Sequence, residues 1–138
     1  MRRTVYERNY VKLEGILGGN LKEVFEKYGY LKLKANGYMD LSVDVLSDNT
    51  LSLAHNYELN GDIVPDPDME IEVNFDLRTV EALTMQNIFG YVEVYTYTDD
   101  GKKKGIYPER KKELNEFLSL WLKNLKEQKH SIAETRGK

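Results

Sequence analysis

Apolar residues recur at helical spacing at the start of the chain. One stripe runs from Tyr6 to Leu17 at spacings of three and four residues, and a Gly-Gly pair follows it. Asn20, with Glu23 three residues later, is typical of the first residues of a second helix. The sequence therefore predicts two short N-terminal helices, over residues 6–17 and 21–28.

The middle of the chain changes to a period of two. Four segments alternate between apolar and polar residues: 30–34, 39–45, 51–59 and 69–76. Such alternation is typical of strands with one buried and one exposed face. Residues 60–68 contain Pro65 and Pro67, and proline is excluded from central strands, so we expect a loop there.

The last third of the chain predicts more strand and one long helix. Residues 80–87 fit either a strand or a bend, and residues 91–97 alternate as a strand. Pro108 then precedes an amphipathic stripe that runs from Leu114 to Leu125 and includes Trp121, which we expect to be core. The polar residues after 128 predict a flexible tail.

These elements together predict an α+β fold. We expect an antiparallel β-meander of about five to six strands, with two short N-terminal helices and one long C-terminal helix on one face. Residues 1–128 are expected to form a single α+β domain, and residues 129–138 a flexible C-terminal tail. The sequence leaves the oligomeric state open.

Composition excludes several classes of protein. The 138 residues contain no cysteine, so disulfides and thiolate chemistry are excluded. The longest apolar runs are far shorter than the roughly 20 residues that a transmembrane helix needs. No signal-peptide pattern follows the basic start of the chain. We therefore expect a cytoplasmic protein with no membrane partner.

Charge is distributed unevenly along the chain. Residues 35–81 contain eleven acidic residues and one base, Arg78, whereas the net charge of the whole chain is only −3. Several of these acids occupy the polar positions of the predicted strands. The sequence therefore predicts an acidic sheet face, which is either a solvated outer surface or a docking surface for a basic protein.

The segments 70–86 and 109–122 carry a family resemblance. A strand, an acidic segment of the form V-E-x-L…Q and a helix with an L-N-x-F-L-x-x-W-L pattern follow in this order. The chain resembles domain of unknown function 6908, which is found mainly in Gram-positive chromosomes and mobile elements. Its C-terminal half is more distantly similar to domain of unknown function 1249, but lacks the Tyr-Pro-Asn segment before the last helix. The resemblance implies a bacterial origin and carries no known activity.

The acidic face provides the candidate partner-binding residues. These are Asp40, Asp44, Glu70, Glu72, Asp76, Tyr91, Tyr95 and Tyr97. Tyrosines can anchor an interface, whereas the acids repel phosphate, so we expect a basic protein partner and no direct nucleic-acid binding through this face. An anti-defence inhibitor of a nucleic-acid-binding protein is one form of this hypothesis.

A ligand-binding or enzymatic domain, with a pocket between sheet and C-terminal helix, is the alternative. His55 is the one candidate base inside a predicted element, and no nucleophile motif accompanies it. Asp62, Asp66 and Asp68 could surround a cation only if their loop curled around it. We therefore predict no catalytic residues, no metal site and no cofactor.

Overall fold

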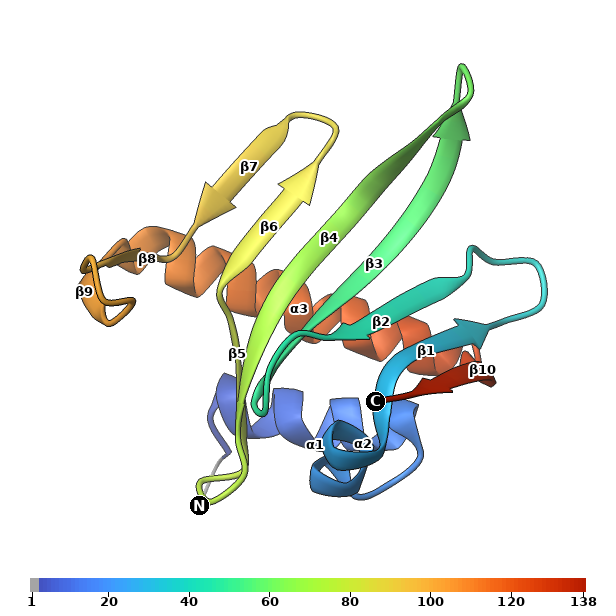
Figure 1. The fold of residues 1–138 in the computed structure, drawn as a ribbon, viewed down its shortest axis with the longest axis horizontal. Helices are drawn as coiled ribbons and strands as arrows, with labels where there is room; N and C mark the ends of the chain where they lie inside the picture. Colours follow the sequence, from blue (N-terminus) through green and yellow to red (C-terminus); the bar gives the residue numbers. More distant parts are fainter. Residues whose placement is uncertain (1–2) are drawn as a thin grey trace.

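A large antiparallel sheet with helices packed on one face forms the protein, so the predicted α+β class is confirmed (Figure 1). The computed structural model describes residues 3–138, apart from the side chains of residues 57–59 and 63–66. In Figure 1 the long helix α3 crosses behind the strands, and α1 and α2 lie near the lower end of the sheet. Within residues 3–138, no helix is long and apolar enough to span a bilayer.

The three helices lie close to their predicted positions. They are α1 (Val5–Leu17), α2 (Leu21–Lys27) and α3 (Pro108–Glu127). A capping box begins α1, in which Thr4 and Glu7 bond each other's backbone amides. Asn20 begins α2, and its side chain accepts from the amide of Glu23 at 3.2 Å, as the sequence predicts.

The main sheet has eight strands, so the prediction of five to six was too low. Its order is β10-β1-β2-β3-β4-β6-β7, with β5 also paired to β4, and β8 and β9 form a separate hairpin. The strands are β1 (Tyr28–Lys34), β2 (Leu41–Val45), β3 (Thr50–Leu59), β4 (Asp62–Asn74), β5 (Thr79–Ala82), β6 (Thr84–Asn87), β7 (Gly90–Glu93), β8 (Tyr95–Tyr97), β9 (Lys103–Ile106) and β10 (Ser131–Gly137).

The core lies between the sheet and the helices. Alternate residues of β1–β4, such as Leu31, Val43 and Ile71, are fully buried on the helix side. Trp121 of α3 is 7% exposed, so its predicted core position is confirmed. Its ring meets the ring of His55 edge-on at 5.4 Å between centroids.

The loop predicted at residues 60–68 is instead the start of β4. Asn60 and Gly61 both have positive φ, 53° and 85°, and they form a two-residue hairpin turn between Leu59 and Asp62. Pro65 and Pro67 are tolerated because this part of β4 pairs only with β3; β6 joins β4 at Asp68. Figure 1 shows this hairpin projecting beyond the sheet.

The flexible tail predicted after residue 128 is wrong for residues 131–137. These form β10, which pairs antiparallel with β1 and completes one edge of the sheet. Lys32 of β1 lies opposite Glu134, and their charged groups are 3.9 Å apart. The pairing is between segments about a hundred residues apart, which local composition does not reveal.

Candidate functional site

The face of the sheet away from the helices carries two cross-strand rows of polar side chains. In the first row, Asp44 lies opposite Ser52, and Ser52 opposite Glu70. A β-bulge sets both Leu83 and Thr84 beside Glu70, whose amide bonds the Thr84 hydroxyl at 3.2 Å. Thr84 in turn lies opposite Glu93, so the row continues onto β7.

The second row brings another acid next to the first. Ala54 lies opposite Asp68, Asp68 opposite Gln86, and Gln86 opposite Tyr91. Asp68 and Glu70 are two residues apart on β4, so their side chains leave the same face. We call Asp44, Asp68, Glu70 and Glu93 the acidic patch. It spans β2, β4 and β7.

The acids of the patch lie close to one another without a neutralising cation among the described side chains. None of the four makes an ion pair with any side chain that the structure describes. Asp68 is half-buried, and this burial, together with the negative charges of Glu70 and Asp44, raises the pKa of its carboxyl group. The fold therefore holds like charges together at a cost in electrostatic energy.

Two tyrosines border the acidic patch. Tyr91 of β7 and Tyr97 of β8 are 54% and 44% exposed. Burial of part of each ring, and negative charges that include Glu70 and Glu93, raise the pKa of both hydroxyl groups, although Lys103 opposes this at Tyr97. The patch thus combines carboxylates with exposed aromatic rings.

Other predicted site residues lie outside the patch. Glu72 shares the face but pairs with Lys103 at 3.0 Å. Asp40 lies in the loop before β2, and Asp76 in the turn between β4 and β5. Tyr95 is buried and does not share the exposed face of Tyr91 and Tyr97 as predicted. The strand is interrupted at Val94, and the register of β8 with β9 shifts between Thr96 and Tyr97.

Tyr95 is instead part of a buried contact. It is 8% exposed, and its hydroxyl group donates to the carboxylate of Glu81. Lys111 of α3 also approaches Glu81, at 3.8 Å. The ring of Tyr95 lies under the ammonium group of Lys103, 4.3 Å from the centroid. Tyr95 therefore joins the β8–β9 hairpin to the sheet and is not free to anchor a partner.

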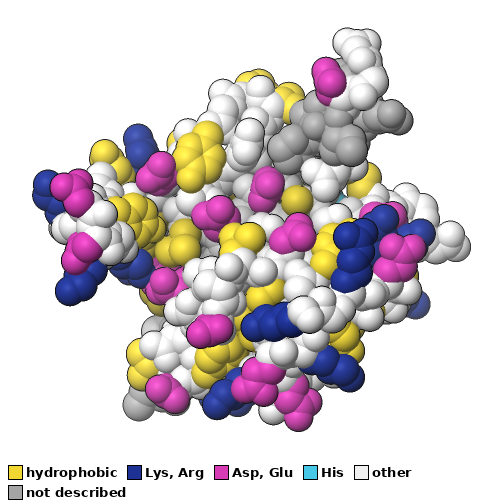
Figure 2. Space-filling model, viewed as in Figure 1, with side chains coloured by type: hydrophobic (Ala, Val, Ile, Leu, Met, Phe, Trp, Pro, Cys, Tyr) yellow, Lys and Arg dark blue, Asp and Glu magenta, His cyan; other side chains and the backbone are white. Residues whose placement is uncertain are grey.

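Asp68 and Glu93 are patch residues that the candidate set omitted. Asp68 is the last residue of the segment 60–68, which the sequence predicts as a loop because it contains two prolines. Glu93 follows the same alternation as Tyr91, so its position was visible in the sequence. Figure 2, viewed from the side away from α3, shows acidic side chains over the central strands of this face.

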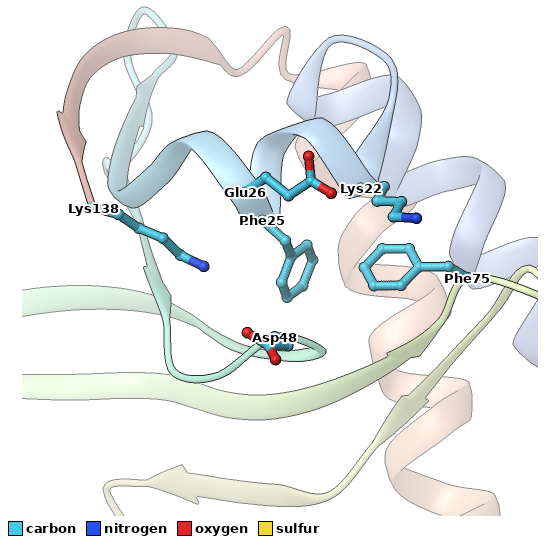
Figure 3. Close-up of a pocket in the computed structure, with 6 residues that line it drawn as sticks. All are labelled: Lys22, Phe25, Glu26, Asp48, Phe75 and Lys138. Carbon is cyan, nitrogen blue, oxygen red and sulfur yellow. The ribbon is translucent and has the colours of Figure 1, made fainter.

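A separate cavity of about 360 Å³ lies between α2 and the β2–β3 turn (Figure 3). The rings of Phe25 and Phe75 meet edge-on inside it, 5.3 Å apart. Charged side chains surround them: Lys22, Glu26, Asp48 and Lys138. This cavity is not at the place predicted for a pocket, since side chains such as Leu118 and Trp121 fill the space between the sheet and α3.

His55 is packed into the core side of the sheet. Its Nδ1 donates to the carbonyl oxygen of Asp40 at 2.9 Å, and its ring lies 6.0 Å from that of His130. Burial is the main cause that lowers the pKa of His55. Among the side chains that the structure describes, no three His, Asp or Glu groups converge as a metal site, and Asp66 lies outside them.

Comparison with known proteins identifies the family and nothing beyond it. No curated protein and no solved structure matches the chain. The similarity to domain of unknown function 1249 stays a prediction. The family model of domain of unknown function 6908 (DUF6908) matches residues 10–131, and the chain therefore belongs to this family.

Proposed function

We propose that the protein is a non-catalytic interaction module that binds a basic protein through the acidic patch. The observation that carries this proposal is the set of carboxylates held side by side on the sheet face away from the helices, none of them in an ion pair with a described side chain. Like charges at this spacing repel one another. A cationic partner would relieve the repulsion, so binding would recover electrostatic energy that the free protein lacks.

The two tyrosines suggest how such a partner would be held. Lys and Arg side chains bind over aromatic faces as well as to carboxylates. Tyr91 and Tyr97 expose their rings beside Glu70 and Glu93, so one basic side chain could contact both kinds of group. Aromatic residues at the centre of an interface contribute much of its binding energy.

A concrete form of the proposal is an inhibitor of a nucleic-acid-binding protein in the bacterial cytoplasm. The carboxylates would occupy the basic groove that normally binds phosphates, and a mobile element would encode the inhibitor. Long-range attraction between the opposite charges would accelerate association with such a partner.

A pull-down from a bacterial lysate tests the proposal. The bait proteins are wild type and the double variant Asp44→Lys/Glu70→Lys, both of whose sites are exposed. The wild type should retain a basic protein, and the variant should lose it. We choose Asp44 and Glu70 over Glu72, because changing Glu72 would also break its ion pair with Lys103.

The matched control is Glu109→Lys/Glu113→Lys, which makes the same charge change on exposed positions of α3. This control should retain the same protein as wild type. Equal retention by all three baits would show that the patch is only a solvated surface, provided that circular dichroism shows the same fold in each.

A further inference from the structure

Helices α1 and α3 lie side by side with their N-termini at the same end. A cavity of about 270 Å³ is lined by Val5 and Arg8 of α1 and by Lys112 and Glu116 of α3. The next cavity, of about 290 Å³, shares Arg8 and Glu116 and extends to Lys12 and Lys123. The two cavities thus form a groove along the contact between the helices.

Cations from both helices line the groove, together with apolar residues and one acid. The residues that line the groove recur at spacings of three and four along each helix, so they lie on one face of each helix. At its far end the ammonium group of Lys126 lies 2.8 Å from where a Cβ on Gly15 would be, so this glycine leaves room for the lysine. We define the basic seam as Arg8, Lys12, Lys112 and Lys123, which line the groove, and Lys126 at its end. Lys111 also lines the groove but pairs with Glu81 at 3.8 Å. Glu116 is the acid between them.

The cations of the seam repel one another in the free protein. Lys12 is half-buried, and burial together with the charges of Arg8 and Lys123 lowers the pKa of its ammonium group. Lys12 donates to the hydroxyl and carbonyl oxygens of Ser119, at 2.7 and 3.2 Å. Among the described side chains, only Lys123 of the seam has an acid partner, the exposed Glu127 at 3.9 Å.

The N-terminus of α3 adds positive potential at one end of the seam. Its N-cap residue, Tyr107, makes no capping side-chain hydrogen bond, and Pro108 is the first helical residue. The first-turn amides of α3 are therefore not closed by a cap, whereas Thr4 and Glu7 close those of α1. A phosphate at this end would meet both backbone amides and cationic side chains.

We infer that the basic seam binds the phosphodiester backbone of a single-stranded nucleic acid. From Lys112 to Lys126 the seam is about 21 Å long, with cations at intervals of about one or more helical turns. A linear array of this kind matches a chain that carries one charge per nucleotide. Aromatic rings favour a nucleic acid over an acidic peptide, since Tyr6 lines the groove and Tyr107, at its end, is 43% exposed.

This inference is independent of the acidic patch. The seam lies on the helix layer and the patch on the opposite face of the sheet, so a nucleic acid and a basic protein would occupy different surfaces. Loss of one activity would leave the other intact.

Fluorescence anisotropy of a labelled oligothymidylate tests the inference. Wild type should bind the oligonucleotide at about 50 mM salt, and its affinity should be lower at about 200 mM. A plot of the logarithm of the association constant against the logarithm of the salt concentration should have a slope of about −0.7 for each phosphate neutralised. The variant Arg8→Gln/Lys112→Gln/Lys123→Gln should bind at least about tenfold more weakly at the lower salt, with a slope smaller by about 2. The matched control Lys34→Gln/Lys102→Gln/Lys104→Gln changes exposed lysines outside the seam and should bind as wild type does.

Three outcomes would overturn the inference. They are no binding by wild type at low salt, equal loss in the seam and control variants, and displacement of the oligonucleotide by polyglutamate at the same charge concentration. The last outcome would assign the seam to an acidic protein. The polyglutamate competition uses wild type alone, so it distinguishes a nucleic acid from an acidic protein even where circular dichroism shows that the seam variant has lost its fold.

Discussion

Two glutamates on β4, only two residues apart, have opposite surroundings. The carboxylate of Glu72 pairs with Lys103 at 3.0 Å, and the same lysine lies over the ring of Tyr95. Glu70 instead lies beside Asp68, whose pKa it helps to raise. The charge environment therefore changes over two residues of β4, although Glu70 and Glu72 point to the same side of the sheet.

This contrast predicts opposite effects of one conservative change. Glu70→Gln should raise the free energy of unfolding slightly, whereas Glu72→Gln should lower it by about 0.5 kcal/mol, the scale of a partly exposed ion pair. Urea denaturation at low salt measures both, and each variant serves as the control for the other. An equal loss in the two would mean that Glu70 is compensated in a way that its surroundings do not show.

His55 gives the stability of the protein a dependence on pH. Burial lowers the pKa of its ring in the folded state, so the unfolded chain takes up a proton at a higher pH than the folded one. Stability is therefore full above the unfolded value of about 6.5 and is lost as the pH falls from there through the folded pKa. Urea denaturation of wild type at pH 7.5 and 5.5 should show this loss.

The substitution His55→Asn tests the assignment. Asparagine can donate to the carbonyl oxygen of Asp40 as the Nδ1 of His55 does, but it does not titrate. The variant should lose less stability than wild type between the two pH values. A loss as large as that of wild type would assign the dependence to a group other than His55.

At the scale of elements, local signals predicted the helices and most strands. The stripes of α1 and α3 and the Asn20 cap were readable because each depends on residues within a few positions. Pro65 and Pro67 led to the prediction of a loop after Asn60 and Gly61, where the structure has a hairpin. A strand segment that is paired on one side only accepts proline.

Other features depended on contacts that are distant in sequence. β10 pairs with the edge of β1 that β2 does not occupy. The polar composition of residues 131–137 does not predict this pairing. The interruption at Val94 and the register shift after Thr96 separate the buried Tyr95 from the exposed Tyr91 and Tyr97. The alternation of apolar and polar residues predicted that Asp44 and Glu70 lie on the polar face of their strands. That they lie in one patch follows only from the order of the strands in the sheet.

Hydrogen exchange tests the β10 element directly. Amides of β10 that bond to β1 should exchange more slowly than the same amides in an unstructured peptide, because pairing must open before exchange. The exposed turn at residues 99–101 is an internal reference for fast exchange. Exchange of residues 132–136 at the rate of the unstructured peptide would restore the flexible tail that the sequence predicts.

At the scale of the whole molecule, the fold separates charge between its two layers. Residues 35–81, net −10, supply most of the outer sheet face, and the remaining residues, net +7, include both long helices. A net charge of −3 conceals this separation, since potential acts locally. Association with a charged partner therefore depends on the local charge of each surface and not on the net charge.

The most direct test is the association rate constant for the basic protein that wild type captures. It should fall steeply as salt rises, because exposed charges are screened over about 8–10 Å near physiological ionic strength. In Asp44→Lys/Glu70→Lys it should be far lower and much less sensitive to salt, with the control Glu109→Lys/Glu113→Lys resembling wild type. A rate constant that neither salt nor charge reversal in the patch changes would contradict the account.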